Sequence, residues 1–291
     1  MPLQDGSAYR SVWSHMMRTP FHQDYLDVNG IKTRYVQAGP QDAPAVVMLH
    51  GTSGTWETFC ANIPVLSQHF NCYAIDMVGS GFTGKPDVDY EIPVYVEHVR
   101  DFMKAVGLTH ASFIGVSLGA WIACRLALDN PELVDKLVLL AASGMFADKT
   151  TMGDIRNRRG KAVEDPSWEN ISTIFVSLIY DERNRIPDIV AVRQATYQLP
   201  EMKRAMEHVL CLQDPEIRPR NLIAEQDWKK IAAPTLIIAA PDDKDTFYQT
   251  ALKAGQLIPG AKVVEKKGVK HWAHFEEPEF FNKVSLEFLL S

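Results

Sequence analysis

Apolar runs and helical repeats alternate through the first half of the chain. Four segments consist largely of apolar residues, as in strands that are buried on both faces of a sheet. They are residues 45–49, 71–76, 111–116 and 136–141. Residues 95–106 instead repeat apolar side chains every three or four positions, and residues 118–128 also have a helical pattern. This alternation predicts a parallel sheet with helices on both faces.

Two further stretches complete the predicted sheet. Residues 24–28 and 31–37 flank Asn29-Gly30, the dipeptide typical of a tight antiparallel hairpin. Near the C-terminus the pattern predicts two more strands and two helices. The strands are residues 235–239 and 261–265, and the helices are residues 246–257 and 279–290.

The segment between these halves has a different pattern. From Met145 to about Lys230 it is helical, charged and interrupted by prolines, with no run typical of a buried strand. A structureless connection of that length is rare in a compact domain. We therefore expect an α/β core formed by residues 1–144 and 231–291, with residues 145–230 forming a helical lid over the functional edge of the sheet.

The composition argues against several classes of protein, among them nucleic-acid-binding, zinc-binding and membrane-spanning proteins. The chain has 30 Lys and Arg against 36 Asp and Glu, a net charge of −6, which argues against a nucleic-acid-binding surface. The four cysteines lie far apart with no CxxC pair, so we expect reduced thiols in a cytoplasmic protein and no zinc site. No apolar run is long enough for a membrane helix, and the N-terminus lacks the apolar stretch of a signal peptide.

The pentapeptide Gly115-Val116-Ser117-Leu118-Gly119 is the most informative motif. This G-x-S-x-G pattern follows a predicted strand and precedes a predicted helix, where a sharp turn lifts the serine hydroxyl above the sheet. Its small flanking residues allow such a turn. Ser117 is therefore predicted to be a nucleophile.

A serine nucleophile needs a base that a third group orients. His271 lies between the last predicted strand and the last helix, and is the preferred base; His274 is three residues away. Asp243 follows the strand at residues 235–239 and is the preferred acid. Asp242 is its close competitor and Asp245 a more distant one. The other histidines noted outside this loop are expected at the surface or in the lid: His15, His22, His69, His98, His110 and His208.

Backbone amides should stabilise the oxyanion that forms on the substrate. The amide of Leu118, directly after the nucleophile, is one expected donor. Thr52, in the loop after the strand at residues 45–49, is the other. Its neighbours Gly51 and Ser53 are expected to line the substrate pocket.

One motif in the chain suggests a nucleotide but is not expected to bind it. Residues 79–84 satisfy G-x-G-x-x-G after a strand, yet no helix begins there to receive a pyrophosphate. Pro86 also replaces the residue that would hold Mg²⁺ in a phosphate-binding loop. We therefore expect no nucleotide, metal or other cofactor.

With these residues placed, the chain resembles the α/β-hydrolase superfamily over nearly its whole length. Within it, the chain is most similar to the meta-cleavage product hydrolases. The likeness rests on His271-Trp272-Ala273, on Tyr180-Asp181 followed by Arg193, and on the segment from Asp76 to Tyr90. The chain departs from the family's pattern at Val116, Ala120 and Lys270, and in its short loop after Gly51, with Thr58 nearby.

The resemblance implies hydrolysis of a carbon–carbon bond in 2-hydroxy-6-oxo-2,4-dienoates, which form when catechol rings are opened. It implies that Arg193 and Trp272 position this small-molecule substrate. A solvent-exposed charge is the alternative for Arg193, and a core aromatic for Trp272. The resemblance further implies a homodimer or higher homo-oligomer.

Two other functions remain open on the sequence. The same triad would serve a carboxylesterase or a lactonase. A small-molecule receptor that keeps the triad and turns over very slowly is the alternative from another class. Enzymes that use an aspartate nucleophile are disfavoured, because Ser117 occupies that position.

Overall fold

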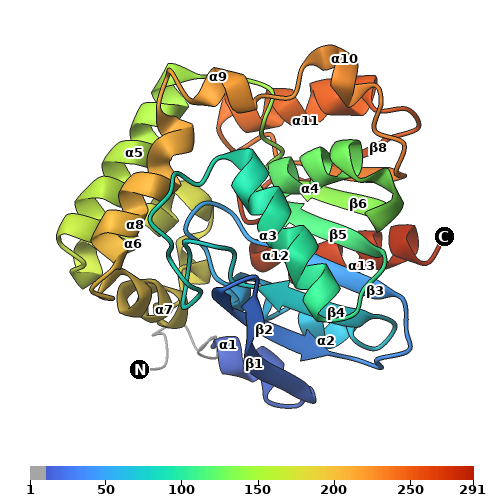
Figure 1. Ribbon diagram of the computed structural model, residues 1–291, viewed down its shortest axis with the longest axis horizontal. Coiled ribbons are helices and arrows are strands. Elements are labelled where there is room, and N and C mark those ends of the chain that lie inside the picture. Colours follow the sequence, from blue (N-terminus) through green and yellow to red (C-terminus); the bar gives the residue numbers. More distant parts are fainter. Residues whose placement is uncertain (1–10) are drawn as a thin grey trace.

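A single sheet of eight strands organises the protein (Figure 1). The computed structural model describes residues 11–291. The expectation that the chain has no secretory leader rests partly on residues 1–10, which lie outside the described part. The strand order is β1-β2-β4-β3-β5-β6-β7-β8. Strands β1 to β4 are Phe21–Val28, Ile31–Ala38, Ala45–Leu49 and Asn71–Ile75; β5 to β8 are Ala111–Val116, Val134–Leu140, Thr235–Ala239 and Lys262–Glu265.

The N-terminal hairpin is antiparallel and the rest of the sheet is parallel. β1 pairs with β2, and β2 pairs antiparallel with β4, whereas β4, β3, β5, β6, β7 and β8 pair in parallel. Asn29 and Gly30 both have positive φ, 50° and 84°, as a type I′ turn requires. All residues of β3, β4, β5 and β7 are buried, which explains their continuous apolar runs.

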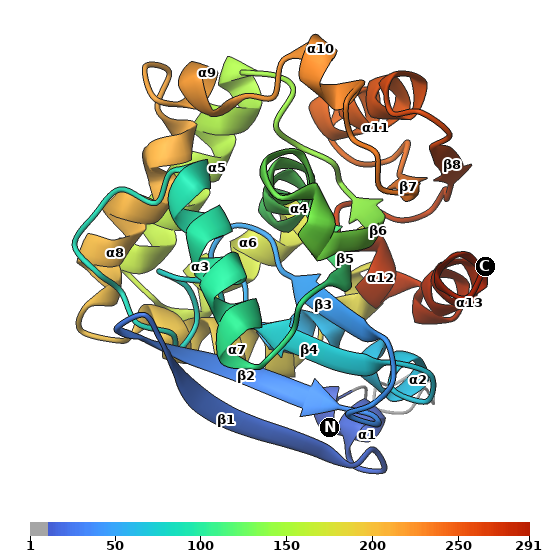
Figure 2. The same ribbon diagram turned by 45° about the vertical axis from the view of Figure 1, so that its right-hand side comes forward.

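Helices cover both faces of the sheet, as the alternating pattern predicted. The helices α3 (Ile92–Ala105) and α4 (Leu118–Asp129) lie on one face, and α2 (Ile63–Leu66) and α13 (Pro278–Leu289) lie on the other (Figure 2). The remaining helices of this part are α1 (Val12–Met16), α11 (Asp245–Leu257) and α12 (Ala273–Glu276), with short 3₁₀ turns η1 (Trp56–Phe59) and η2 (Pro131–Leu133). None of the helices within residues 11–291 is long and apolar enough to cross a membrane.

All the regular secondary structure between β6 and β7 is helical. They are α5 (Lys149–Glu164), α6 (Trp168–Leu178), η3 (Glu182–Asn184), α7 (Pro187–Tyr197), α8 (Met202–Val209), η4 (Leu210–Gln213), α9 (Arg218–Asn221) and α10 (Glu225–Trp228). In Figure 1, α5, α6, α7 and α8 form a group beside the sheet. Residues of α5 and η4 line a cavity with Ser117, which directly follows β5, so this group faces the carboxyl edge of the sheet.

Candidate active site

Ser117 sits on a strained turn between β5 and α4. Its φ and ψ are 56° and −112°, a conformation that costs a non-glycine residue about 1–3 kcal/mol. Three hydrogen bonds hold the turn: the Ser117 N–H donates to Leu140 O at 2.9 Å, and Ser117 O accepts from Trp121 N at 3.1 Å and from Ser143 Oγ at 3.0 Å. The strain therefore persists because the surrounding structure fixes the backbone.

Close packing explains the two glycines of the pentapeptide. A β-carbon at Gly119 would lie 2.1 Å from Leu49 O, and one at Gly115 would lie 2.6 Å from the Ala120 Cα. Neither position has room for a side chain. The turn can thus pass directly over the end of β3 with the serine at its apex.

His271 and Asp243 form a buried hydrogen-bonded pair. His271 Nδ1 lies 2.8 Å from Asp243 Oδ2, and the exposed fractions of the two side chains are 8% and 3%. The Phe247 ring packs edge-on against the imidazole, with ring centroids 4.4 Å apart. The carboxylate and the aromatic ring together fix the orientation of the imidazole.

The structure separates the three candidate acids. Asp242 Oδ2 accepts a hydrogen bond from the Gly268 N–H at 2.8 Å, so this carboxylate closes the loop after β8. Asp245 is the first residue of α11 and accepts from Gln249 Nε2. Only Asp243 contacts His271.

The neighbouring His274 has different surroundings. Its Nε2 lies 2.8 Å from Thr58 Oγ1, and its ring packs against Phe59 and Phe281. Complete burial lowers its pKa to about 3, so it stays neutral at ordinary pH. His274 thus belongs to the core.

Ser117 and His271 line one cavity. With them lie Thr52, Ile155, Arg159, Asp243 and Phe247. In the described part of the chain no hydrogen bond joins Ser117 Oγ to His271, and such bonds often tighten only when substrate binds. The arrangement brings Ser117, His271 and Asp243, the predicted nucleophile, base and acid, to the same edge of the sheet.

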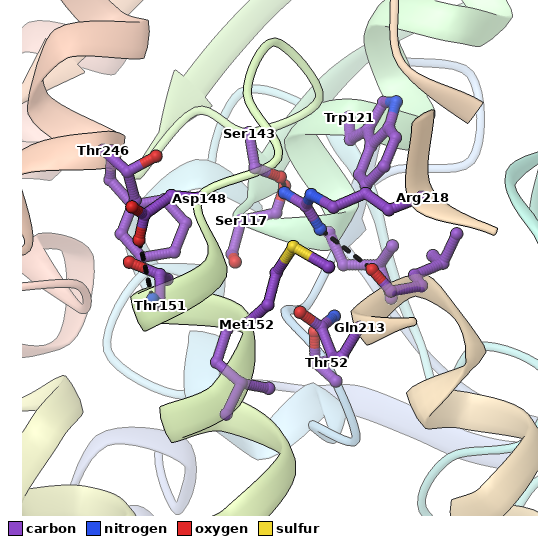
Figure 3. A pocket seen from close by; sticks show the side chains of 14 residues that line it. Thr52, Ser117, Trp121, Ser143, Asp148, Thr151, Met152, Gln213, Arg218 and Thr246 are labelled. Atoms are coloured by element: carbon purple, nitrogen blue, oxygen red, sulfur yellow. Dashed lines mark hydrogen bonds between the residues drawn. The ribbon is translucent and has the colours of Figure 1, made fainter. Parts of the chain in front are cut away.

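The two residues expected to supply amide donors, Leu118 and Thr52, lie beside Ser117. Leu118 begins α4, so its N–H has no intrahelical partner and lies at the positive end of the helix dipole. Leu118 and Thr52 line the same cavity as Ser117. Figure 3 shows Thr52 and Ser117 in this cavity. The backbone of Gly51 comes close as well: a β-carbon there would lie 3.9 Å from Ser117 Oγ.

Ser53 is held by the helices between β6 and β7. Its Oγ lies 2.8 Å from the Tyr197 hydroxyl and accepts from Arg159 Nε at 3.3 Å and from Arg193 Nη1 at 3.5 Å. The residue is 1% exposed. The hydroxyl therefore joins the loop after β3 to α5 and α7.

Arg193 is buried, which excludes the alternative of a solvent-exposed charge. It is 3% exposed and its guanidinium lies 5.5 Å from the ring centroid of Phe175 and 5.7 Å from that of Tyr197. Trp272 is 6% exposed and packs edge to face on Phe175 and Phe275. Trp272 and Arg193 both contact the ring of Phe175. The role of Trp272 in substrate binding stays a prediction.

Arg159 is a site residue that sequence reasoning missed. It is 5% exposed, lines the cavity and shares the hydroxyl of Ser53 with Arg193. Its pKa is lowered to about 10, chiefly by burial; the nearby Arg193 contributes to this lowering, whereas the Tyr197 phenol and the Asp154 carboxylate oppose it. Within residues 11–291, neither guanidinium is ion-paired with a carboxylate. Two buried and unpaired positive charges favour an anionic ligand.

Lys85 and His98, two residues outside the candidate site, have well-defined surroundings. In the glycine-rich loop at residues 79–84, Lys85 Nζ donates to the carbonyls of Gly81 and Thr83, so its amine stabilises the loop itself. The surface placement of His98 is wrong: it is 3% exposed, and its Nε2 lies 2.8 Å from Thr33 Oγ1. Within the described residues, no cluster of His, Cys, Asp and Glu side chains suits a metal ion.

Comparison with known proteins identifies the fold family of the chain and several relatives. The family model of the alpha/beta hydrolase fold matches residues 44–278. A 2-hydroxy-6-oxo-6-(2'-aminophenyl)hexa-2,4-dienoic acid hydrolase of Metapseudomonas resinovorans is 26% identical over 283 residues, which cover 95% of this chain and 93% of the relative. The structure of a meta-cleavage product hydrolase from Pseudomonas fluorescens IP01 has a TM-score of 0.78 at 25% identity, covering 91% of this chain and 97% of the other. A carboxylesterase of Bacillus subtilis is 24% identical over 91% of this chain and 86% of its own length.

Proposed function

The chain belongs to the alpha/beta hydrolase fold family, and within it we propose a serine hydrolase that cleaves a carbon–carbon bond in 2-hydroxy-6-oxo-2,4-dienoates. One observation carries this proposal. The cavity that holds Ser117 and the His271–Asp243 pair also receives Arg159, with Arg193 behind it, and neither guanidinium has a carboxylate partner among the described residues. A neutral ester needs no such charge, whereas a dienoate carries a carboxylate that fits it.

The histidine supplies the proton transfers. Because His271 Nδ1 is bonded to Asp243, its Nε2 is left to act as the base. It removes the proton of Ser117, or of a water molecule, and assists the conversion of the 2-hydroxydiene to its 2-oxo form, in which C5 has gained a proton. The buried carboxylate of Asp243 stabilises the imidazolium that forms.

The carbon–carbon bond then breaks in the usual sequence of acyl transfer. Attack on the C6 carbonyl gives an oxyanion, which the amides of Leu118 and Thr52 stabilise. As the C5–C6 bond breaks, its electron pair moves to the five-carbon fragment, where the 2-oxo group delocalises the charge as an enolate. Water supplies the oxygen of the released carboxylic acid, and a proton completes the five-carbon 2-hydroxydienoate.

The dienoate end binds toward the two guanidiniums. Arg159 lines the cavity, and Arg193 stands against Phe175, which in turn contacts Trp272. A planar, conjugated chain fits beside aromatic rings, and a charge-assisted hydrogen bond to a buried guanidinium fixes its carboxylate. Gly51 and Ser53 complete this end through their backbone and hydroxyl.

The helices between β6 and β7 act as the lid in this proposal. The core then comprises residues 1–144 and 231–291, and the lid residues 145–230. The lid excludes water from the oxyanion and the enolate. All four cysteines are buried and unpaired, which supports a cytoplasmic location. We further propose that the enzyme acts on a small molecule as a homodimer or higher homo-oligomer.

Carboxylester hydrolysis is the second candidate function, and the carboxylesterase relative supports it. The same triad would serve, with an alkoxide in place of the enolate as leaving group. Product analysis separates the two. We expect the 6-phenyl dienoate to yield benzoate and 2-hydroxypenta-2,4-dienoate in equal amounts. Recovery of unchanged dienoate beside complete hydrolysis of p-nitrophenyl acetate would establish the esterase instead.

A further inference from the structure

The cavity at Ser117 has two lobes. The first contains Arg159, His271 and Asp243. The second, which we call the acyl lobe, contains Trp121, Ser143, Met152, Leu212, Gln213 and Arg218. Both lobes are lined by Thr52, Ser117, Ile155 and Phe247. The nucleophile therefore stands where two halves of a substrate would meet.

The charged side chains of the two lobes indicate that the dienoate binds in the first lobe. The guanidiniums there have no carboxylate partner within residues 11–291. Arg218 in the acyl lobe is held by backbone carbonyls: its Nε donates to Phe146 O at 2.8 Å and its Nη1 to Leu212 O at 3.1 Å. A nearby carboxylate favours the charged form of each arginine, Asp148 for Arg218 and Asp154 for Arg159, but Asp154 is already paired with Arg158 and Lys244. The carboxylate end thus binds beside Arg159, and the fragment attached to C6 binds in the acyl lobe.

Much of the wall of the acyl lobe is apolar, but polar side chains lie on two sides of it. Trp121, Met152, Ile155, Leu212 and Phe247 supply aromatic and aliphatic surface. Figure 3 shows Gln213 and Arg218 on one side of Ser117, with Asp148 and Thr151 on the other. A purely hydrocarbon fragment would leave the Gln213 side chain facing it without a partner.

Gln213 has a buried side-chain amide that lacks a hydrogen-bond partner in the described part of the chain. It ends η4, is 7% exposed, and its Oε1 is completely shielded from solvent with no hydrogen-bond partner. Its Nε2 makes no hydrogen bond either among the described residues. A buried amide left without partners destabilises a fold, whereas the same amide can pair with a polar group of a bound molecule.

We infer that the acyl lobe selects a C6 fragment with an apolar body and a hydroxyl or amino group that donates to Gln213. This inference rests on the proposed function and adds the chemical class of the acyl group. A lobe built to hydrogen-bond a substituent rejects the analogue that lacks it far more strongly than an apolar lobe distinguishes two hydrocarbons.

The test compares matched substrates that differ only in the acyl group. The first series is the 6-phenyl dienoate with its three hydroxyphenyl isomers. The second is p-nitrophenyl benzoate with its three hydroxybenzoate isomers. We expect kcat/KM for the best hydroxylated isomer to exceed that of the phenyl parent by about tenfold or more.

Substitution of Gln213 identifies the cause of that preference. In Gln213→Leu, or in Gln213→Met if the first variant folds poorly, the ratio of hydroxylated to parent kcat/KM falls about tenfold. The intrinsic reactivities of the substrates cancel when ratios are compared between variants. Gln249→Leu, an exposed position on α11, serves as the matched control and keeps the wild-type ratio.

Each outcome has a distinct meaning. Equal rates for parent and hydroxylated substrates in the wild-type protein would overturn the inference, as would a preference that survives in Gln213→Leu. The preference in esters alone, with every dienoate left intact, would support the acyl lobe and overturn the proposed carbon–carbon cleavage. Cleavage of the phenyl dienoate without any preference would do the reverse.

Discussion

His271 Nδ1 and Asp243 Oδ2 are 2.8 Å apart in a site where both side chains are almost completely buried. The adjacent carboxylate, Asp242, is directed to the Gly268 amide instead. Two neighbouring aspartates thus have separate tasks: one orients an imidazole and the other closes a loop. This division makes them a natural pair for comparison.

Asp243→Asn should lower kcat strongly. An asparagine at this position would favour the wrong tautomer of His271 and remove the charge that stabilises the imidazolium, a loss of about 10³–10⁴-fold in enzymes with such a triad. The measurement is steady-state hydrolysis of a dienoate and of a p-nitrophenyl ester. Asp242→Asn is the control, and we expect it to change kcat less than about tenfold. Equal losses in the two variants would contradict the assignment of the acid.

Arg159→Met should impair binding of anionic substrates selectively. The variant removes a charge-assisted hydrogen bond, so KM for the dienoate should rise by about 10–100-fold while KM for p-nitrophenyl acetate changes little. Arg156→Met, an exposed residue on the same helix, is the matched control. Equal effects of Arg159→Met on both substrates would count against an anion site.

Gly119→Ala should destabilise the protein by about 1–3 kcal/mol, because the new methyl group would overlap Leu49 O. Gly160 provides the opposite case: it lies within α5, and a β-carbon there meets nothing within 4 Å. Gly160→Ala should therefore stabilise by about 0.5–1 kcal/mol through helix propensity. Urea denaturation of both variants measures these changes, and a stable Gly119→Ala protein would refute the packing argument.

Stability should fall as the pH is lowered from about 6.5 toward 4. Burial lowers the pKa of His50 and that of His98 to about 4 each. His50 Nε2 accepts from the Met77 N–H, and His98 Nδ1 accepts from the Val78 N–H, so protonation would place two donors against each other. The unfolded chain takes up these protons first, which costs the folded state up to about 1.4 kcal/mol per pH unit for each histidine.

A variant separates the effect of histidine protonation on stability from the effect of carboxylate protonation. His98→Asn should show a shallower loss of unfolding free energy between pH 6.5 and 4.5 than the wild-type protein, in urea titrations at each pH. His69→Asn, an exposed position, should keep the wild-type slope. The same slope in all three proteins would disprove the contribution of the buried imidazole.

The strands were predictable because a buried strand appears in the sequence as a continuous run of apolar residues. Strands buried on both faces, such as β3, β5 and β7, consist almost entirely of apolar residues, and the predicted runs match the observed strands to within a few residues. The turn at Ser117 was predictable for a similar reason, since only glycine fits at positions 115 and 119. Local steric rules thus identified the fold and the position of the serine.

Contacts between distant segments were not predictable in this way. Asp242 and Asp243 are adjacent and chemically identical, and only the conformation of the loop decides which one reaches His271. Arg159 lies near Arg156 and Arg158 in a polar helix, and the sequence does not tell which of them is buried. Gln213 lies in a short turn whose surroundings come from the loop after β3, from α4 and from α5.

The most direct test follows the yellow colour of a ring-fission dienoate, with methyl or phenyl at C6, after addition of the protein. Ser117→Ala and a p-nitrophenyl ester are measured in parallel. The proposed function predicts rapid bleaching by the wild-type protein, no bleaching by Ser117→Ala, and a kcat/KM for the dienoate well above that for the ester. A solution that stays yellow while the ester is hydrolysed briskly would contradict carbon–carbon cleavage, and very slow turnover of both would favour a receptor.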